Sequence, residues 1–234
     1  MVKTRSAEAR SPGVPLGTKV VPSRAGGVST FEALLATAGE LLAEVGFESL
    51  STNLICSRAG MTPPALYRYF PNKYAVLKEL GRRLMKAQDD AVFAWMDGGG
   101  LAPAPIEQMV ESNKRIQTEV IAITRAHPGG IWIMRALRAA PILQEVQVES
   151  RDDVAHRLVE ALRGRYPEVT GEHLLAATRL STQMMYAAIE MALESPELEE
   201  QITHEVCWMV HAYYAQLEQR YTRGAPANVA SGEA

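Results

Sequence analysis

The segment SRAGMTPPALYRYFPNK, residues 57–73, most restricts how this chain can fold, because two consecutive prolines follow closely on a glycine. Proline inside a helix removes a backbone hydrogen bond, but the first positions of a helix have no intrahelical partner for their N–H groups. Thr62 can therefore cap a short helix in which Pro63 and Pro64 occupy the first two positions. The prolines predict the start of a helix, and Gly60 predicts the turn before it.

Helices are expected on both sides of this turn. Apolar residues recur at helical spacing from Ser29 to Gly46, and Ser29 with Glu32 has the spacing of a capping box. Ser51 is expected to cap a second short helix over residues 52–59. Two short helices joined by a turn at Gly60, after a helix of about 17 residues, predict a helix-turn-helix unit.

The rest of the chain also keeps a helical apolar period, and no segment alternates with the period of two that strands require. Glycine- and proline-containing breaks divide it into helices expected near residues 73–96, 106–126, 130–138, 142–165, 171–194 and 197–222. We therefore predict an all-α fold.

Charge is unevenly distributed along the chain. The net charge of the 234 residues is −3, but residues 1–86 carry a net +6 and the remainder a net −9. A basic N-terminal third favours a polyanionic partner, although a chance unevenness of the surface would give the same count. Residues 1–28 hold five basic residues and one acid without an apolar period, which predicts a basic arm without fixed structure.

Several classes of protein are not expected. No apolar run reaches the roughly 18 residues of a membrane span, and the two cysteines are far apart, as in a protein of a reducing cytoplasm. No HExxH, GxSxG, P-loop or dinucleotide glycine pattern is present, so we predict neither an enzyme nor a cofactor.

One helix carries a possible metal-ligand series, but its spacing does not suit a single ion. His204, Cys207 and His211 lie on one face of the helix near residues 197–222. Residues seven apart rise about 10 Å along a helix, which is too far for zinc bonds of about 2 Å. No metal site is predicted.

From about Phe31 to Leu80, the sequence resembles the tetracycline-repressor (TetR) family of bacterial transcription regulators. The resemblance includes LLAEVGFESLSTNLICSRAGMTPPALYRYFPNKYAVL, in which Gly46-Phe47 ends the first helix and Arg58-Ala59-Gly60 leads into the turn. It implies four parts: a basic arm over 1–28, a helix-turn-helix DNA-binding domain over 29–75, an effector-binding and dimerisation domain over 76–222, and a flexible tail over 223–234.

The resemblance implies that the helix-turn-helix unit binds double-stranded DNA at a pseudo-palindromic operator. Tyr67 and Lys73 match family positions that hold phosphates, and Arg68 is the candidate for bidentate binding of a guanine. The expected DNA-binding residues are Ser51, Asn53, Thr62, Pro63, Pro64, Tyr67, Arg68 and Lys73. The expected core beneath them comprises Ile55, Ala59, Leu66 and Phe70 with Leu41, Leu42, Val45 and Phe47.

The resemblance also implies a cavity for a small-molecule effector. Asn113 and Gln117 interrupt the apolar stripe of their helix, and a buried amide requires a partner, which can be a ligand, another side chain or water. The expected effector-binding residues are Met109, Asn113, Ile116, Gln117, Trp132, Met184 and Tyr186. For the apolar members of this set, ordinary core packing is the alternative.

A homodimer is expected because the last two helices are apolar over more than one stripe and so need cover on two sides. The expected interface residues are Ala177, Ser181, Ala188, Val206, Val210 and Tyr213, and the alternative for them is the core of a monomer. We therefore predict a DNA-binding transcriptional regulator. The resemblance implies that it is a repressor, released by a small, largely apolar effector. The alternative is a DNA-binding regulator or architectural protein without an inducer.

Overall fold

The computed structural model describes residues 14–223, and within them the secondary structure is entirely helical, as predicted. The helices are α1 (Ala25–Ser49), α2 (Thr52–Arg58), α3 (Pro63–Tyr67), α4 (Lys73–Trp95), α5 (Ile106–Ala126), α6 (Gly130–Ala139), α7 (Gln144–Leu162), α8 (Gly171–Glu194) and α9 (Glu199–Arg223). Short turns η1 (Met96–Gly100), η2 (Pro141–Leu143) and η3 (Pro196–Leu198) join some of them. The chain divides into two compact units between Leu80 and Gly81.

Helix α1 begins four residues earlier than the sequence predicted. Arg24 occupies its N-cap position without a capping side chain, and Ser29 lies inside the helix, so the predicted capping box is wrong. The hydroxyl of Thr30 donates to the carbonyl of Gly26 at 2.9 Å, as a helix-interior side chain can. Gly46 interrupts the helix as predicted, because its φ of +74° is a conformation that glycine adopts readily.

The segment before α1 contacts the end of α3. The backbone N–H of Lys19 donates to the carbonyl of Tyr69 at 2.7 Å, and the side-chain amide of Asn72 donates to the carbonyl of Pro15 at 2.8 Å. The prediction of an arm without fixed structure is therefore wrong for residues 14–28, while residues 1–13 and the tail beyond 223 lie outside the described residues.

Aromatic rings fill the core of the first unit. Phe31 of α1 stacks on Phe70 at 5.0 Å between ring centroids and meets Tyr69 edge-on at 5.4 Å. The predicted core members Leu41, Leu42, Ile55, Leu66 and Phe70 have no exposed surface. Val45 is 37% exposed, so its assignment to this core was wrong; it directly precedes Gly46, where the helix is interrupted.

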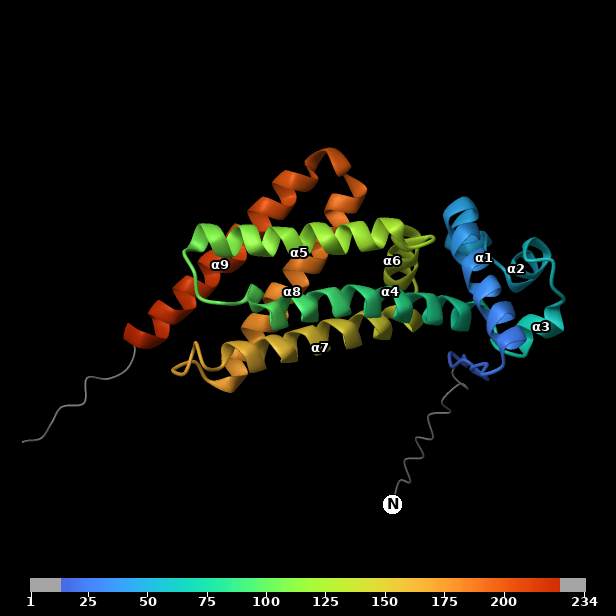
Figure 1. Ribbon diagram of the computed structural model, residues 1–234, viewed down its shortest axis with the longest axis horizontal. Coiled ribbons are helices and arrows are strands. Elements are labelled where there is room, and N and C mark those ends of the chain that lie inside the picture. Colours follow the sequence, from blue (N-terminus) through green and yellow to red (C-terminus); the bar gives the residue numbers. More distant parts are fainter. Residues whose placement is uncertain (1–13, 224–234) are drawn as a thin grey trace, which may run out of the picture. The chain divides into compact units, whose positions relative to one another are not determined.

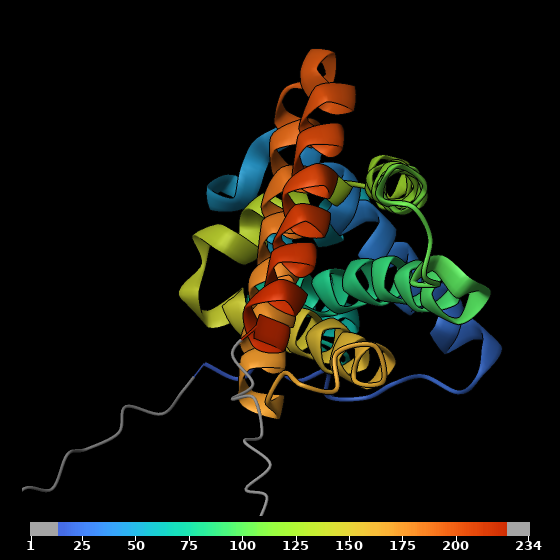
Figure 2. The same cartoon turned by 90° about the vertical axis from the view of Figure 1, so that its left-hand side faces the viewer.

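The second unit is built around helices α8 and α9, which lie side by side as an antiparallel pair (Figure 1 and Figure 2). Helix α5 packs against both members of this pair, and α7 packs against α8. The second half of α4 adds the residues that pack against α5 and α8, including Val92 and Trp95. These helices bury an apolar core, and they also enclose a space.

Candidate nucleic-acid interface and ligand cavity

Helix α3 separates its side chains into a buried and an exposed set. Leu66 is fully buried and so is Phe70 just beyond the helix, whereas Thr62, Pro63, Pro64, Tyr67 and Arg68 are exposed. The prolines occupy the first two helical positions as predicted, and Thr62 stands at the N-cap without a capping hydrogen bond from its side chain. Its hydroxyl is consequently available to an external partner.

The exposed tyrosine of α3 is linked to the start of α2. Tyr67 is 41% exposed, and its hydroxyl shares a hydrogen bond of 3.0 Å with the hydroxyl of Thr52. Ser51 accepts from the backbone N–H of Leu54 at 3.2 Å, which confirms its predicted capping position, and Asn53 is exposed beside it. The structure thus brings the predicted residues of α2 and α3 onto neighbouring positions. Thr52 was missed, although its hydroxyl lies one residue after the predicted cap.

Arg68 and Lys73, the two basic residues predicted to bind DNA, differ in their contacts within the protein. Arg68 is exposed, with its guanidinium 5.6 Å from the ring centroid of Tyr69. Lys73 donates to the carbonyls of Phe47 at 3.1 Å and Glu48 at 3.3 Å. Lys73 therefore ties the start of α4 to the end of α1, and an ammonium has three donors, so one remains for a phosphate.

A further basic group beside α3 was not predicted to bind DNA. Lys19 donates from its ammonium to the carbonyl of Tyr67 at 3.2 Å and remains exposed. The contact joins residues 48 positions apart in the sequence, and no local spacing in the sequence indicates it.

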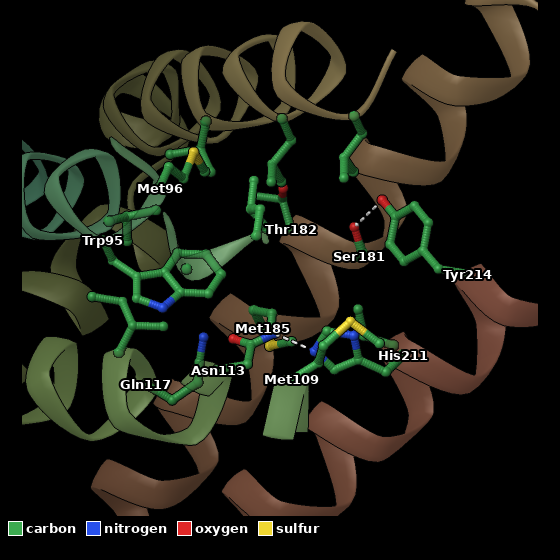
Figure 3. A pocket seen from close by; sticks show the side chains of 18 of the residues that line it. Trp95, Met96, Met109, Asn113, Gln117, Ser181, Thr182, Met185, His211 and Tyr214 are labelled. Carbon is green, nitrogen blue, oxygen red and sulfur yellow. Dashed lines mark hydrogen bonds between the residues drawn. The ribbon is translucent and has the colours of Figure 1, made fainter. Parts of the chain in front are cut away.

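A cavity of about 180 Å³ lies within the second unit, with walls from α4, α5, α7, α8 and α9 (Figure 3). A water molecule requires roughly 10–15 Å³ on a comparable measure, so the cavity is far larger than a packing defect. Five of the seven predicted effector residues line it: Met109, Asn113, Ile116, Gln117 and Tyr186.

The other two predicted effector residues do not line this cavity. Trp132 is 38% exposed, and its ring lies 4.8 Å from the guanidinium of Arg135. Met184 lines a shallow groove on the outer side of α8 and α9 instead. Both were misassigned because periodicity does not distinguish the side of a helix that faces a cavity from the side that faces another neighbour.

A glycine-rich turn contributes to the cavity wall through Gly100. The indole of Trp95 lies so close to Gly100 that a side chain at that position would overlap it. The indole N–H donates to the hydroxyl of Ser112 at 3.1 Å, which fixes the ring. The run Gly98-Gly99-Gly100, which the sequence indicated only as a break, thus shapes the cavity wall.

Three buried polar atoms on the cavity residues have no hydrogen-bond partner among the described residues: Gln88 Oε1, Gln117 Oε1 and Thr182 Oγ1. All three side chains are at least 95% buried. Leaving such a group unpaired costs about 1–3 kcal/mol, so these atoms require an external partner. Gln88 and Thr182 were missed, because the apolar pattern of their helices does not mark either position as buried.

The cavity lining also holds two basic side chains, His211 and Arg165. The side-chain amide of Asn113 lies 3.4 Å from Nε2 of His211, and burial, followed by the charge of Arg165, lowers the pKa of His211. The guanidinium nitrogens of Arg165 lie 3.6 and 3.7 Å from the sulfur of Met109. Arg165 is therefore the cationic group of the cavity lining.

A polar cluster joins the cavity wall to α4. The carboxylate of Asp89 accepts from Ser150 at 2.9 Å and from Tyr186 at 3.0 Å. Burial raises the pKa of Asp89 to about 6, more than these two hydrogen bonds lower it. The cluster thus connects α4, α7 and α8 through groups with little access to water.

Most of the predicted dimer residues are buried within the second unit itself. Ala177, Ser181, Ala188, Val206 and Val210 are all at least 93% buried, and the hydroxyl of Ser181 shares a hydrogen bond of 3.1 Å with that of Tyr214. They form the contact between α8 and α9, so the stripe was assigned to the wrong side of the pair. The large apolar residues Leu180, Met191 and Met209 of these helices are exposed. Leu180 and Met209 line a groove together with the half-buried Met184 and Tyr213.

Among residues 14–223, no three potential ligand side chains gather as a metal site would require. His204 lies against the ring of Trp208 at 6.3 Å between centroids. None of the described helices has the length and apolar character needed to cross a membrane.

Comparison with known proteins places the first unit in a family. Residues 34–80 match the model for bacterial regulatory proteins of the tetR family. The tetracycline repressor protein class C of Escherichia coli is 44% identical over 54 residues, which are 23% of this chain and 25% of that protein. The chain thus matches about a quarter of the length of this curated relative.

The fold extends the similarity over most of the chain. The SmeT–triclosan complex matches with a TM-score of 0.58 at 21% identity, covering 79% of this chain and 91% of that one. A transcriptional regulator from Rhodococcus sp. Rha1 matches with a TM-score of 0.59 at 18% identity (80% and 96% covered). A tetR-family transcriptional regulator from Streptomyces coelicolor matches with a TM-score of 0.57 at 19% identity (83% and 87% covered).

Proposed function

Because this chain belongs to the TetR family of bacterial regulatory proteins, we propose that it is a homodimeric repressor that a small, largely apolar effector releases from its operator. The observation that carries this proposal is the cavity of about 180 Å³, which is lined by three buried polar atoms without a partner. A protein that needed only a stable core would lose stability at these positions and gain nothing from them.

DNA binding in this proposal uses the exposed set of α3 and its neighbours. Tyr67 and Lys73 bind phosphates, and Arg68 reads one base pair in the major groove. The prolines Pro63 and Pro64 have no side-chain donors, so they offer apolar contact of the kind that a thymine methyl group favours. Lys19, which lies against Tyr67, adds a positive charge beside the same helix.

Dimerisation in this proposal uses the exposed side of the α8–α9 pair rather than its buried side. Leu180 and Met209 are 53% and 56% exposed and line one groove with Met184 and Tyr213. Leu180→Glu or Met209→Glu should dissociate the dimer, since each places a charge in an apolar contact. Val148→Glu is the control, because Val148 is similarly exposed (48%) but lies on α7. Sedimentation that shows unchanged dimers in both groove variants would contradict this interface.

The effector acts through α4 in this proposal. Gln88, Val92 and Trp95 of α4 line the cavity, while Lys73 in the first turn of the same helix holds the end of α1. Helix α4 has residues in both units, and in this proposal a ligand bound against its second half acts on the first unit through this helix. It shifts the population away from the DNA-binding form only to the extent that it binds the two forms with different affinity.

The proposal is tested by selecting DNA from a random pool with the full chain, and repeating the selection with mixtures of small metabolites. A pseudo-palindromic consensus that is lost with one mixture supports the proposal. Recovery of the same DNA with every mixture would favour the alternative, a DNA-binding regulator or architectural protein without an inducer. Recovery of no consensus would contradict DNA-sequence recognition itself.

A further inference from the structure

The cavity of the second unit has two chemically different ends. Helix α5 runs along it, with Met109 near one end, Asn113 in the middle and Gln117 near the other, as Figure 3 shows. Eight residues of helix separate Met109 from Gln117, which corresponds to about 12 Å along the axis. A ligand that fills the cavity therefore meets both ends.

The end near Gln117 presents two amide oxygens, those of Gln88 and Gln117, that can only accept and that lack a donor. Gln88 donates from its amide nitrogen to the hydroxyl of Thr124 at 2.7 Å, and that hydroxyl donates to the carbonyl of Val120 at 2.8 Å. Because the proton of Thr124 is already used, its hydroxyl must accept from Gln88. This arrangement fixes the orientation of the Gln88 amide and leaves its oxygen without a donor.

A second amide oxygen repeats this demand. Gln117 Oε1 is also buried without a partner, and its side chain lines the cavity. The buried hydroxyl of Thr182 lines the cavity too, but it can donate as well as accept. Water can bind such oxygens while the cavity is filled with solvent, but a ligand that displaces this water must supply its own donors or leave the oxygens unpaired. This end therefore selects a ligand that carries an O–H or N–H group.

The opposite end presents a positive charge. Arg165 lies against the weakly accepting sulfur of Met109 and 5.6 Å from the ring centroid of Tyr166, and among the described residues no carboxylate lies within 4 Å of it. Burial, followed by the charge of Arg165, lowers the pKa of His211 and so disfavours its charged form. Among the described residues that line the cavity there is no aspartate or glutamate. A cationic ligand would thus be desolvated without a counter-charge, whereas an anionic group meets Arg165.

We propose, resting on the proposed function, that the effector is an elongated, mostly apolar organic acid whose far end carries a neutral hydrogen-bond donor, a hydroxyl or an amide N–H. The carboxylate binds at Arg165, the apolar body packs between Met109 and Trp95, and the donor binds at the amide oxygens of Gln88 and Gln117. Each end requires a different feature of the ligand, so each can be tested separately.

Calorimetric titration of the full chain with four probes tests the ligand class. The probes are 6-(4-hydroxyphenyl)hexanoate, its 4-methoxy analogue, its methyl ester and the corresponding 6-(4-hydroxyphenyl)hexylamine. We expect the hydroxy acid to bind about tenfold more tightly than the methoxy analogue, which lacks the donor, and at least tenfold more tightly than the amine. The ester should bind more weakly than the acid.

Two variants assign these preferences to the cavity. Gln117→Met removes the acceptor while keeping the length of the side chain, and should reduce the preference for hydroxy over methoxy to less than about threefold. Arg165→Met should remove the preference for acid over amine but keep the preference for hydroxy over methoxy. Arg163→Met is the control, because Arg163 is exposed and does not line the cavity; it should leave both preferences unchanged.

Equal binding of the hydroxy and methoxy acids, tighter binding of the amine than of the acid, or no binding of any probe at millimolar concentration would overturn this ligand class. These results are separable from failure of the proposed function. If the chain selects no DNA sequence, the repressor proposal fails, while the probe preferences still decide what the cavity binds.

Discussion

The helix-turn-helix unit and the cavity of the second unit use polar side chains in opposite ways. In the first unit the polar residues of α3 face solvent, and the rings of Phe31 and Phe70 fill the core beneath them. In the second unit Gln88, Gln117 and Thr182 are buried around a space that the apolar walls leave open. An exposed polar group is hydrated in the absence of DNA and costs the folded protein little stability. A buried polar group without a partner lowers the stability of the fold. The difference supports the proposal that the second unit binds a ligand in its interior, whereas the first presents its polar groups to DNA.

The largest expected effect is on the packed core of the first unit. Phe70→Ala should lower the free energy of unfolding of this unit by about 3–5 kcal/mol, because it removes a fully buried ring that stacks on Phe31. Val45→Ala should cost far less, since Val45 is 37% exposed. Chemical denaturation followed by circular dichroism measures both. Similar losses in the two variants would contradict a core that depends on the aromatic stack.

The next effect concerns the polar cluster beside the cavity. The pKa of Asp89 is raised from 3.8 to about 6, so the native state binds its proton more tightly than the unfolded state does. The contribution of this group to stability therefore increases as the pH falls from about 6 to about 4 and is lost as the pH rises through about 6. A shift of about two units corresponds to at most about 3 kcal/mol.

Asp89→Asn tests this sign, because the amide keeps an oxygen for Ser150 and Tyr186 but carries no charge. The free energy of unfolding of the variant minus that of wild type should be up to about 3 kcal/mol larger at pH 7 than at pH 4. Asp90→Asn is the control, since Asp90 is exposed and pairs with Lys86 at 2.7 Å. Urea denaturation at the two pH values measures the difference, and identical pH profiles of Asp89→Asn and wild type would contradict the assignment.

A smaller effect is expected on the DNA-binding surface. Arg68→Ala should lose discrimination at one operator position by about 1–3 kcal/mol if its exposed guanidinium binds one guanine. The measurement is binding to a panel of operators that each differ by one base pair. A uniform loss of affinity across the panel would mean instead that Arg68 binds a phosphate.

The smallest effect is expected for the tyrosine hydroxyl of α3. Tyr67→Phe should weaken binding to every DNA sequence by about 0.5–1.5 kcal/mol, because a phosphate contact made by a neutral hydroxyl is lost. Thr52→Val is a matched variant, since it removes the other member of the Tyr67–Thr52 hydrogen bond and leaves the tyrosine hydroxyl in place. Loss of affinity in Thr52→Val equal to that in Tyr67→Phe would show that the pair, rather than Tyr67 alone, contacts the backbone.

The two units also differ in how far their sequences predict them. Gly60, Pro63 and Ser51 each act through the local backbone, so the turn, the start of α3 and the cap of α2 followed from the order of residues. The early start of α1 was missed because the segment before it is held by contacts that are not local. Residue 15 contacts residue 72, and residue 19 contacts residue 69. Such contacts leave no periodic pattern in the sequence.

In the second unit, helical periodicity identified the helices but not the direction in which each apolar stripe faces. Asn113 and Gln117 were found because polar residues interrupt an otherwise apolar stripe. Ser181 was assigned to a dimer and Trp132 to the cavity because both helices are apolar on several sides. The unpaired oxygen of Gln88 becomes evident only from the contact of its amide with Thr124, 36 residues away.

In the proposed mechanism, a ligand in the cavity of the second unit controls DNA binding by the first. Operator affinity of wild type and of Gln117→Met, measured while 6-(4-hydroxyphenyl)hexanoate is titrated, tests this mechanism. We expect equal DNA affinity without the probe, loss of DNA binding by wild type as the probe is added, and about tenfold more probe for half-release of Gln117→Met. Release of both proteins at the same probe concentration, or of neither while the probe binds, would contradict it.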